Sequence, residues 1–152
     1  MHITSQPGGG TTVTLCLPVA HRSVSAVEPL AVSSVTSGKG RLLVVDDEPL
    51  VRLGTAEMLR DEGYEVDEAD CAETALGFAP FDRFACVVTD YLMPGLNGVE
   101  LANRIKADRP TLPILLLSGF ADLEAFSALP YVSKPCFGED LARAVAELIA
   151  TG

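Results

Sequence analysis

From residue 41 onward, short apolar runs alternate with stretches that have the apolar spacing of helices, and this alternation constrains the fold most strongly. The runs at 42–45, 86–89 and 114–117 are apolar at nearly every position, which is typical of strands buried on both faces of a parallel sheet. Further strands are predicted at 64–69 and 131–133, and helices from 49 to about 62, at 71–79, at 99–107, and around the apolar stripe Leu141, Val145, Leu148 and Ile149. Five such alternations predict an α/β fold with a doubly wound, five-stranded parallel sheet.

The first forty residues differ in composition from the rest of the chain. They contain no aromatic residue but eleven Ser or Thr, five Gly and three Pro, so they cannot build a core of their own. Residues 12–18 alternate polar and apolar side chains after three glycines, which predicts a strand that ends at Pro18 and lacks an obvious neighbour. We therefore expect a strand-containing piece at 1–18, a flexible linker at 19–40 and one domain at 41–152.

The composition excludes several classes of partner. The formal net charge is −10, and an acidic surface repels phosphate backbones and anionic lipids, so neither nucleic acid nor membrane is expected as a partner. No apolar run approaches the roughly 18 residues that a membrane span needs. The four cysteines, which form no CxxC pair, are Cys16, Cys71, Cys86 and Cys136. This pattern favours a reduced, cytoplasmic protein over a disulfide scaffold.

Polar residues follow four of the predicted strands. The first strand ends in Asp46 and Asp47, the third in Asp90, the fourth in Ser118 and the fifth in Lys134. Because the carboxyl ends of parallel strands meet at one edge of a sheet, these side chains are expected to converge there. Carboxylates suit Mg²⁺, and a lysine with a hydroxyl can cradle phosphoryl oxygens. The alternative is that these polar residues are simply solvated at the strand ends and have no function. Solvation alone would explain such a residue at one strand better than matching residues at four strands.

The residues at these positions resemble the receiver domain of two-component response regulators, which has the flavodoxin-like fold. Segment 44–49 resembles the acidic-pair motif, and segment 90–98, Asp-Tyr-Leu-Met-Pro-Gly-Leu-Asn-Gly, matches the phosphoacceptor loop. Segments 116–119 and 133–135 resemble the switch-hydroxyl strand and the lysine–proline pair. The motifs stand in order from about residue 41 to residue 150.

The resemblance implies a magnesium site and a phosphoacceptor. Asp90 would accept a phosphoryl group from a phosphohistidine on a histidine kinase or a histidine phosphotransfer protein. Asp47 and Asp90 would bind Mg²⁺ directly, Asp46 directly or through water, and Leu92 through its backbone carbonyl. The domain would catalyse only its own phosphorylation and dephosphorylation, and so would not be an enzyme with a separate substrate.

The resemblance also implies a switch. Lys134 would pair with Asp90 before transfer and with the phosphoryl group afterwards, while Ser118 would donate a hydrogen bond to a phosphoryl oxygen. Tyr131 stands where the family places its rotating aromatic residue, although an aromatic in a strand is more often a core residue. The peptide bond between Lys134 and Pro135 is expected to be cis.

The chain departs from the family pattern in two places. Only residues 119–130 separate the fourth and fifth strands, so the fourth helix must be short or irregular, and the family's usual dimer cannot be assumed. Leu92 offers no polar group to orient a hydrolytic water, whereas Gly119, which has no side chain, leaves the phosphoryl group open to water. The lifetime of the phosphorylated state and the oligomeric state therefore stay open.

Residues 8–18 resemble the end of a histidine kinase ATP-binding domain, where a glycine-rich turn leads into the last strand. This resemblance implies the tail of a hybrid histidine kinase, truncated at or near Met1, with its own kinase domains as a partner in cis. The only histidines, His2 and His21, are not on helices suited to a phosphodonor.

Two rival functions differ in class. A pseudo-receiver that only binds other proteins would be favoured if the acidic pair, the acceptor or the lysine were missing, and all are present. An aspartyl phosphatase of the haloacid dehalogenase type needs a second aspartate two residues after the first, where this chain has Leu92.

Overall fold

A computed structural model describes residues 2–6, 8, 10–14, 39–119 and 129–151 of the chain. The chain divides into two units, Met1–Ser34 and Val35–Gly152. Most of the predicted linker at 19–40 and most of the predicted fourth helix between 119 and 130 lie outside the described residues. No helix within these ranges is long and apolar enough to cross a membrane.

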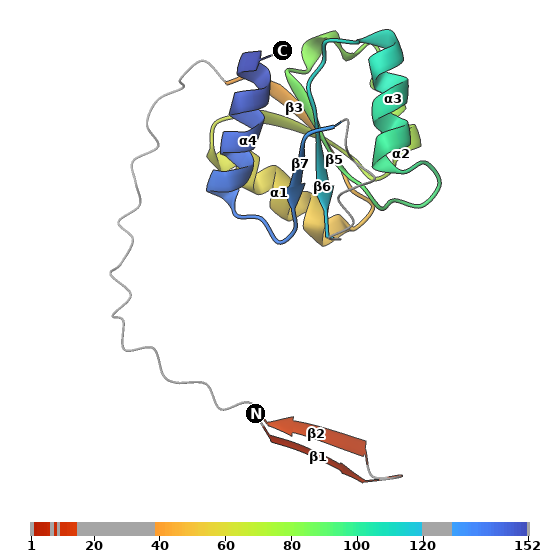
Figure 1. Ribbon diagram of the computed structural model, residues 1–152, viewed down its shortest axis with the longest axis vertical. Coiled ribbons are helices and arrows are strands. Elements are labelled where there is room, and N and C mark those ends of the chain that lie inside the picture. The colour runs from red at the N-terminus through yellow and green to blue at the C-terminus, as the bar shows by residue number, and fades with distance from the viewer. Residues whose placement is uncertain (1, 7, 9, 15–38, 120–128, 152) are drawn as a thin grey trace, which may run out of the picture. The chain divides into compact units, whose positions relative to one another are not determined.

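A five-stranded parallel sheet with the order β4-β3-β5-β6-β7 forms the centre of the larger unit (Figure 1). Its strands are β3 (Arg41–Val45), β4 (Glu65–Ala69), β5 (Cys86–Asp90), β6 (Ile114–Ser118) and β7 (Tyr131–Ser133). Every pairing is parallel, and β3 lies between the next strand in sequence and β5. This order reverses at β3, so the predicted doubly wound, flavodoxin-like fold is confirmed.

Helices cover both faces of the sheet, because alternate residues of each buried strand point to opposite sides. Helices α1 (Pro49–Asp61) and α4 (Gly138–Thr151) pack on the face that carries Leu42 and Val44. Helices α2 (Ala72–Leu76) and α3 (Gly98–Asp108) pack on the face that carries Leu43 and Val45, as Figure 1 shows. The two cores therefore meet at the inner strands, which are almost fully buried.

The second helix is shorter than predicted. It ends at Leu76 rather than near residue 79, and a short 3-10 helix, η1 (Phe81–Arg83), follows. The backbone N–H of Gly77 caps the helix by donating to carbonyls of the preceding turn, and Pro80 has no N–H with which to continue it. Phe81 then turns inward and is fully buried.

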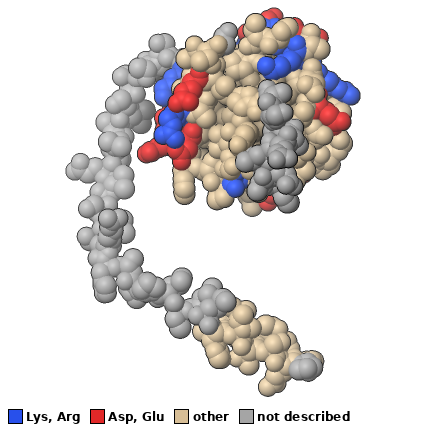
Figure 2. All heavy atoms as spheres, in the orientation of Figure 1, with Lys and Arg blue, Asp and Glu red and all other residues tan. Residues whose placement is uncertain are grey.

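The smaller unit contains a hairpin of β1 (His2–Gln6) and β2 (Gly10–Thr14). The strands pair antiparallel, with Ile3 opposite Val13, so the prediction of a strand without a neighbour was wrong. The second strand also begins at Gly10, earlier than residue 12, and its predicted end at 15–18 lies outside the described residues. Every residue of both strands is exposed, and none of them is charged (Figure 2).

Candidate functional site

Side chains from four strands meet at the carboxyl edge of the sheet. Asp46 directly follows β3, Asp90 and Ser118 are the last residues of β5 and β6, and Lys134 directly follows β7. The Lys134 ammonium nitrogen lies 2.6 Å from Asp90 Oδ1 and 2.8 Å from Asp46 Oδ2. One cation thus bridges two carboxylates that stand 44 residues apart in the sequence.

The three charged groups are largely removed from water. The side chain of Asp46 is 4% exposed, that of Asp90 12% and that of Lys134 24%. Burial raises the pKa of the Asp90 carboxyl despite the hydrogen bond from Lys134. Burial acts to lower the pKa of Lys134, but the hydrogen bonds to Asp46 and Asp90 outweigh it and the pKa is raised. The lysine is therefore fully charged at neutral pH, while burial disfavours the ionised form of the Asp90 carboxyl.

Asp46 is fixed on several sides. Its second carboxylate oxygen, Oδ1, accepts a hydrogen bond from the backbone N–H of Glu48 at 2.9 Å. Its backbone carbonyl accepts one from the guanidinium of Arg52, a residue of α1, at 2.7 Å. Sequence reasoning missed Arg52, although the helix start at Pro49 places residue 52 in the first turn of α1.

The loop after Asp90 is built around a close approach of two backbone segments. A Cβ added to Gly98 would lie 2.2 Å from the backbone carbonyl oxygen of Asp90, a contact that no side chain can tolerate. Only glycine therefore fits at the start of α3. Asn97 and Glu100 form a capping box there, each side chain accepting from the other residue's backbone N–H. These contacts fix the loop that carries the expected acceptor.

Ser118 and Tyr131 lie on neighbouring strands but differ in burial. Ser118 is buried, and its backbone carbonyl accepts a hydrogen bond from the Lys134 backbone N–H at 2.7 Å. Tyr131 is 40% exposed, so the alternative interpretation of Tyr131 as a core residue was wrong. The Lys134–Pro135 peptide bond is cis.

Two of the expected metal ligands converge on one cation. Asp46 and Asp90 converge, whereas Asp47 and Leu92 are exposed, and no group of three or more acidic, histidine or cysteine side chains among the described residues is placed to hold a metal. The donor chemistry nevertheless fits Mg²⁺, because two carboxylates already converge on one cation and Asp47 adjoins them in the chain. Of the expected ligands, Asp46 and Asp90 are therefore the pair that this arrangement already presents.

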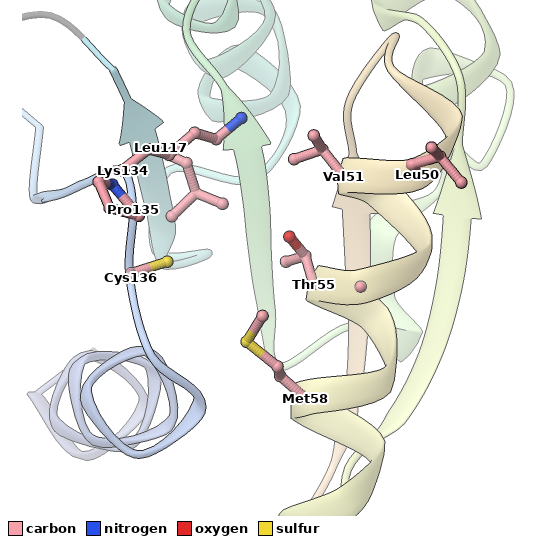
Figure 3. A pocket seen from close by; sticks show the side chains of 9 residues that line it. Leu50, Val51, Thr55, Met58, Leu117, Lys134, Pro135 and Cys136 are labelled. Atoms are coloured by element: carbon pink, nitrogen blue, oxygen red, sulfur yellow. The ribbon is translucent and has the colours of Figure 1, made fainter. Parts of the chain in front are cut away.

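An apolar cavity of about 490 Å³ adjoins the lysine. Figure 3 shows Lys134, Pro135 and Cys136 on one side of it and Val51, Thr55 and Met58 of α1 on the other. Burial raises the pKa of the Cys136 thiol, which keeps it protonated at neutral pH. The cavity thus continues the site toward α1 with an apolar wall.

A second cysteine belongs to the core of the sheet. Cys86 is fully buried on β5, and burial raises its pKa to about 12. It is a packing residue of the sheet and takes no part in the polar site.

Comparison with known proteins shows what the chain resembles. Over residues 42–146 it matches the model of the response regulator receiver domain. The transcriptional regulatory protein FixJ of Bradyrhizobium diazoefficiens is 36% identical over 115 residues, which cover 72% of this chain and 56% of FixJ. The sensor kinase CckA of Brucella abortus is 28% identical over an alignment of 165 residues, which covers 98% of this chain and 18% of CckA.

A solved structure shares both the fold and the sequence pattern. The response regulator TrrA of Thermotoga maritima, crystallised in complex with Mg²⁺-BeF, superimposes with a TM-score of 0.65 and 36% sequence identity. The match covers 72% of this chain and 98% of the TrrA chain.

Proposed function

The chain belongs to the response regulator receiver domain family, and we propose that it accepts a phosphoryl group on Asp90 from a phosphohistidine in a two-component system. The observation that carries this proposal is the pair of buried carboxylates, Asp46 and Asp90, held by the single ammonium of Lys134. A buried carboxylate next to a lysine is a candidate nucleophile with a ready electrostatic partner.

The proposed transfer is an in-line displacement at phosphorus. A carboxylate oxygen of Asp90 forms the new O–P bond while the P–N bond to the donor imidazole breaks, and the imidazole nitrogen leaves with the electron pair. Lys134 can exchange its hydrogen bond to Asp90 for one to a phosphoryl oxygen, because Asp46 still holds the ammonium near the site. This exchange places the positive charge of Lys134 beside the negatively charged oxygens of the transferred phosphoryl group.

Mg²⁺ is the proposed cofactor. Asp46, Asp47 and Asp90, with the backbone carbonyl of Leu92, would hold it, and the bound ion would neutralise phosphoryl oxygens during transfer. The matched TrrA structure, which contains Mg²⁺-BeF, supports this assignment.

Ser118 and Tyr131 are the proposed switch. Ser118 stands on the strand next to Asp90, so its hydroxyl can hydrogen-bond a phosphoryl group on that residue. Tyr131 is in the neighbouring strand β7, where its partly exposed side chain has room to change orientation. Movement of the serine toward the phosphoryl group would open space for the tyrosine to turn inward.

We further propose that the chain is the C-terminal part of a hybrid histidine kinase, with a remnant of the ATP-binding domain at 1–18, a linker at 19–40 and the receiver at 41–152. The alignment with CckA covers 98% of the chain and so reaches into the N-terminal unit, which supports this arrangement. The phosphoryl donor would then be a histidine kinase domain of the same protein, or a histidine phosphotransfer protein, in the cytoplasm.

Incubation with acetyl phosphate, with and without Mg²⁺, followed by intact mass measurement tests the proposal. The wild type should gain one phosphoryl group only when Mg²⁺ is present, and Asp90→Asn should gain none. Asp61→Asn removes an exposed carboxylate at the end of α1 and serves as the matched control, which should behave like the wild type. A wild type that gains no mass and binds no beryllofluoride would instead support a pseudo-receiver that acts only through protein–protein contacts.

A further inference from the structure

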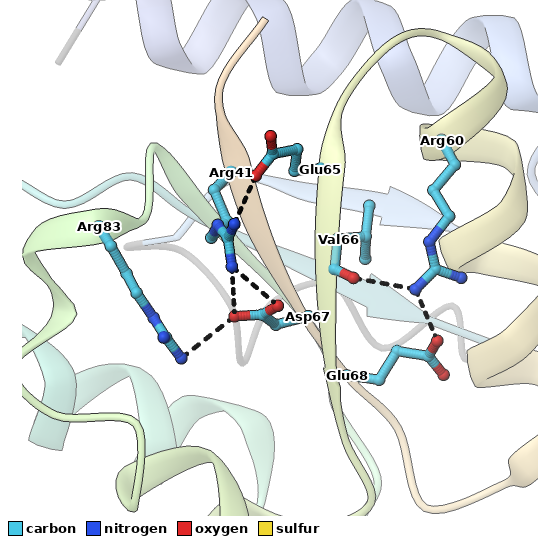
Figure 4. Close-up of polar contacts among 7 residues, drawn as sticks. All are labelled: Arg41, Arg60, Glu65, Val66, Asp67, Glu68 and Arg83. Atoms are coloured by element: carbon cyan, nitrogen blue, oxygen red, sulfur yellow. Dashed lines mark hydrogen bonds and ion pairs between the residues drawn. The ribbon is translucent and has the colours of Figure 1, made fainter. Parts of the chain in front are cut away.

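Helix α1 holds the edge strand β4 through two arginines that share one carboxylate. Arg60 lies 2.9 Å from Glu68 Oε1 and also donates to the backbone carbonyl of Val66 at 2.9 Å (Figure 4). Arg52, two turns earlier on the helix, lies 3.6 Å from the other oxygen, Glu68 Oε2. Both arginines therefore attach the helix to the same glutamate.

The two arginines differ in their second contact. Arg60 reaches a carbonyl within β4, remote from the acidic pair, whereas Arg52 donates at 2.7 Å to the backbone carbonyl of Asp46. The Arg52 side chain is also the more buried of the two, at 17% exposed against 40%. Only Arg52 thus links the Glu68 anchor to the functional site.

The Asp46 carbonyl belongs to the peptide unit that joins Asp46 to Asp47. The first hydrogen bond of α1 is accepted two residues further on, by the carbonyl of Glu48, so the backbone of the helix does not hold the Asp46 carbonyl. The side-chain hydrogen bond from the Arg52 guanidinium to the Asp46 carbonyl fixes the orientation of the Asp46–Asp47 peptide plane. The direction in which Asp47 leaves the strand end depends on that orientation, because the plane is rigid.

We propose that Arg52 is a positioning residue: braced by Glu68, it orients the Asp46–Asp47 peptide so that Asp47 is held for Mg²⁺ binding. This inference rests on the proposed function in that it takes Asp47 as a metal ligand. In this arrangement one cation, the Arg52 guanidinium, organises the binding site of another. Partners that orient metal ligands are commonly worth one to two orders of magnitude in affinity.

The sign of the effect separates positioning from simple electrostatics. A guanidinium beside carboxylates repels an incoming Mg²⁺, so if charge were its only contribution, its removal would tighten binding. If Arg52 positions the peptide, its removal weakens binding even though the site becomes more negative. The two explanations therefore predict opposite changes in the dissociation constant.

A ¹⁵N NMR titration of the 152-residue chain with Mg²⁺ measures that change. Arg52→Met keeps the aliphatic stem and removes the donors, and we expect its Mg²⁺ dissociation constant to rise on the order of tenfold. Arg60→Met is the matched control, because it also breaks an ion pair to Glu68 but leaves the Asp46 carbonyl bonded, and it should stay within about twofold of wild type. Arg52→Lys keeps the charge but lacks the planar fork that reaches both partners, so it should also weaken binding.

The metal-free spectra provide a second measurement. The amide signals of Asp47 and Glu48 should shift in Arg52→Met and not in Arg60→Met, because only the first releases the peptide. Tighter Mg²⁺ binding by Arg52→Met, or equal effects of the two methionine variants, would overturn the inference; if Arg52→Met does not fold, the lysine variant decides. A wild type that binds Mg²⁺ as described but accepts no phosphoryl group would contradict the proposed function and leave the role of Arg52 standing.

Discussion

The inner strands and the β7 edge of the sheet contribute to the same site but are built differently. Strands β5 and β6 are buried at every residue and β3 at all but its first, and these strands lead to Asp46, Asp90 and Ser118. Strand β7 is three residues long, exposed or half-buried throughout, and leads to Lys134. The carboxylates are therefore fixed by the core, while the cation that joins them comes from the least buried strand of the sheet.

Under the proposed function, the two regions would have distinct tasks. A group that must keep its position is best placed on a packed strand, and a group that must exchange partners is best placed where little packing resists movement. Changes in the inner region should therefore cost stability, and changes at the β7 edge should cost little of it. The following substitutions test that division.

The largest loss of stability is expected from Gly98→Ala. The new Cβ would lie 2.2 Å from the Asp90 carbonyl oxygen, and a backbone atom of an inner strand cannot yield. We expect a loss on the order of 4 kcal/mol in the free energy of unfolding, at the upper end for overpacking, measured by urea denaturation. A loss below about 1 kcal/mol would mean that the acceptor loop moves more easily than the inner strands.

A direct comparison of the two regions uses Leu116 and Tyr131, which are register partners on β6 and β7. Leu116 is fully buried, so Leu116→Ala should cost about 3 kcal/mol through lost burial and a cavity. Tyr131→Ala, at a partly exposed position, should cost about 1 kcal/mol or less in the same urea experiment. Similar losses for the two variants would remove the distinction between core and edge.

Asp90→Asn, at the end of an inner strand, is the exception to this division, because its expected effect has the opposite sign. Because burial raises the pKa of the Asp90 carboxyl in the fold, its ionised form destabilises the native state at neutral pH. The asparagine variant should therefore be more stable than wild type by about 1 kcal/mol at pH 7, the scale of one buried polar substitution.

The pH dependence checks the cause of that gain. The contribution of Asp90 to stability is fully present below its unfolded pKa of 3.8 and is lost as the pH rises through the higher folded pKa. The advantage of Asp90→Asn should thus vanish near pH 3 in thermal melts. A gain that persists in acid would point to packing rather than to the buried charge.

The inner sheet could be predicted from the sequence because its signal is local. The runs at 42–45, 86–89 and 114–117 are so apolar that only a strand covered on both faces accommodates them, and the structure has strands there. The convergence of Asp46, Asp90, Ser118 and Lys134 followed from the strand-end rule alone. Neither the strands nor the convergence of these residues required knowledge of a side-chain contact.

The features that were missed depend on specific contacts and not on the local pattern of apolar residues. Strand β1 has no apolar alternation beyond Ile3, so only its pairing with β2 identifies it as a strand. The resemblance implied the pairing of Lys134 with Asp90, but the second bond of Lys134, to Asp46, and the contact of Arg52 with the Asp46 carbonyl are set by side-chain reach in the folded protein. The charge and the periodicity of a sequence predict that such residues lie near one another, but they do not predict which atoms form hydrogen bonds.

The span of the Lys134–Asp46 contact has a consequence for the order of assembly. The two residues are 88 positions apart, and Lys134 follows the last strand of the sheet. During synthesis, Asp46 and Asp90 are added to the chain long before Lys134, the residue whose charge neutralises them. Until β7 joins the sheet, the two aspartates lack the ammonium group that neutralises them. The last strand of the sheet and the last residue of the site are therefore put in place in the same late step of folding.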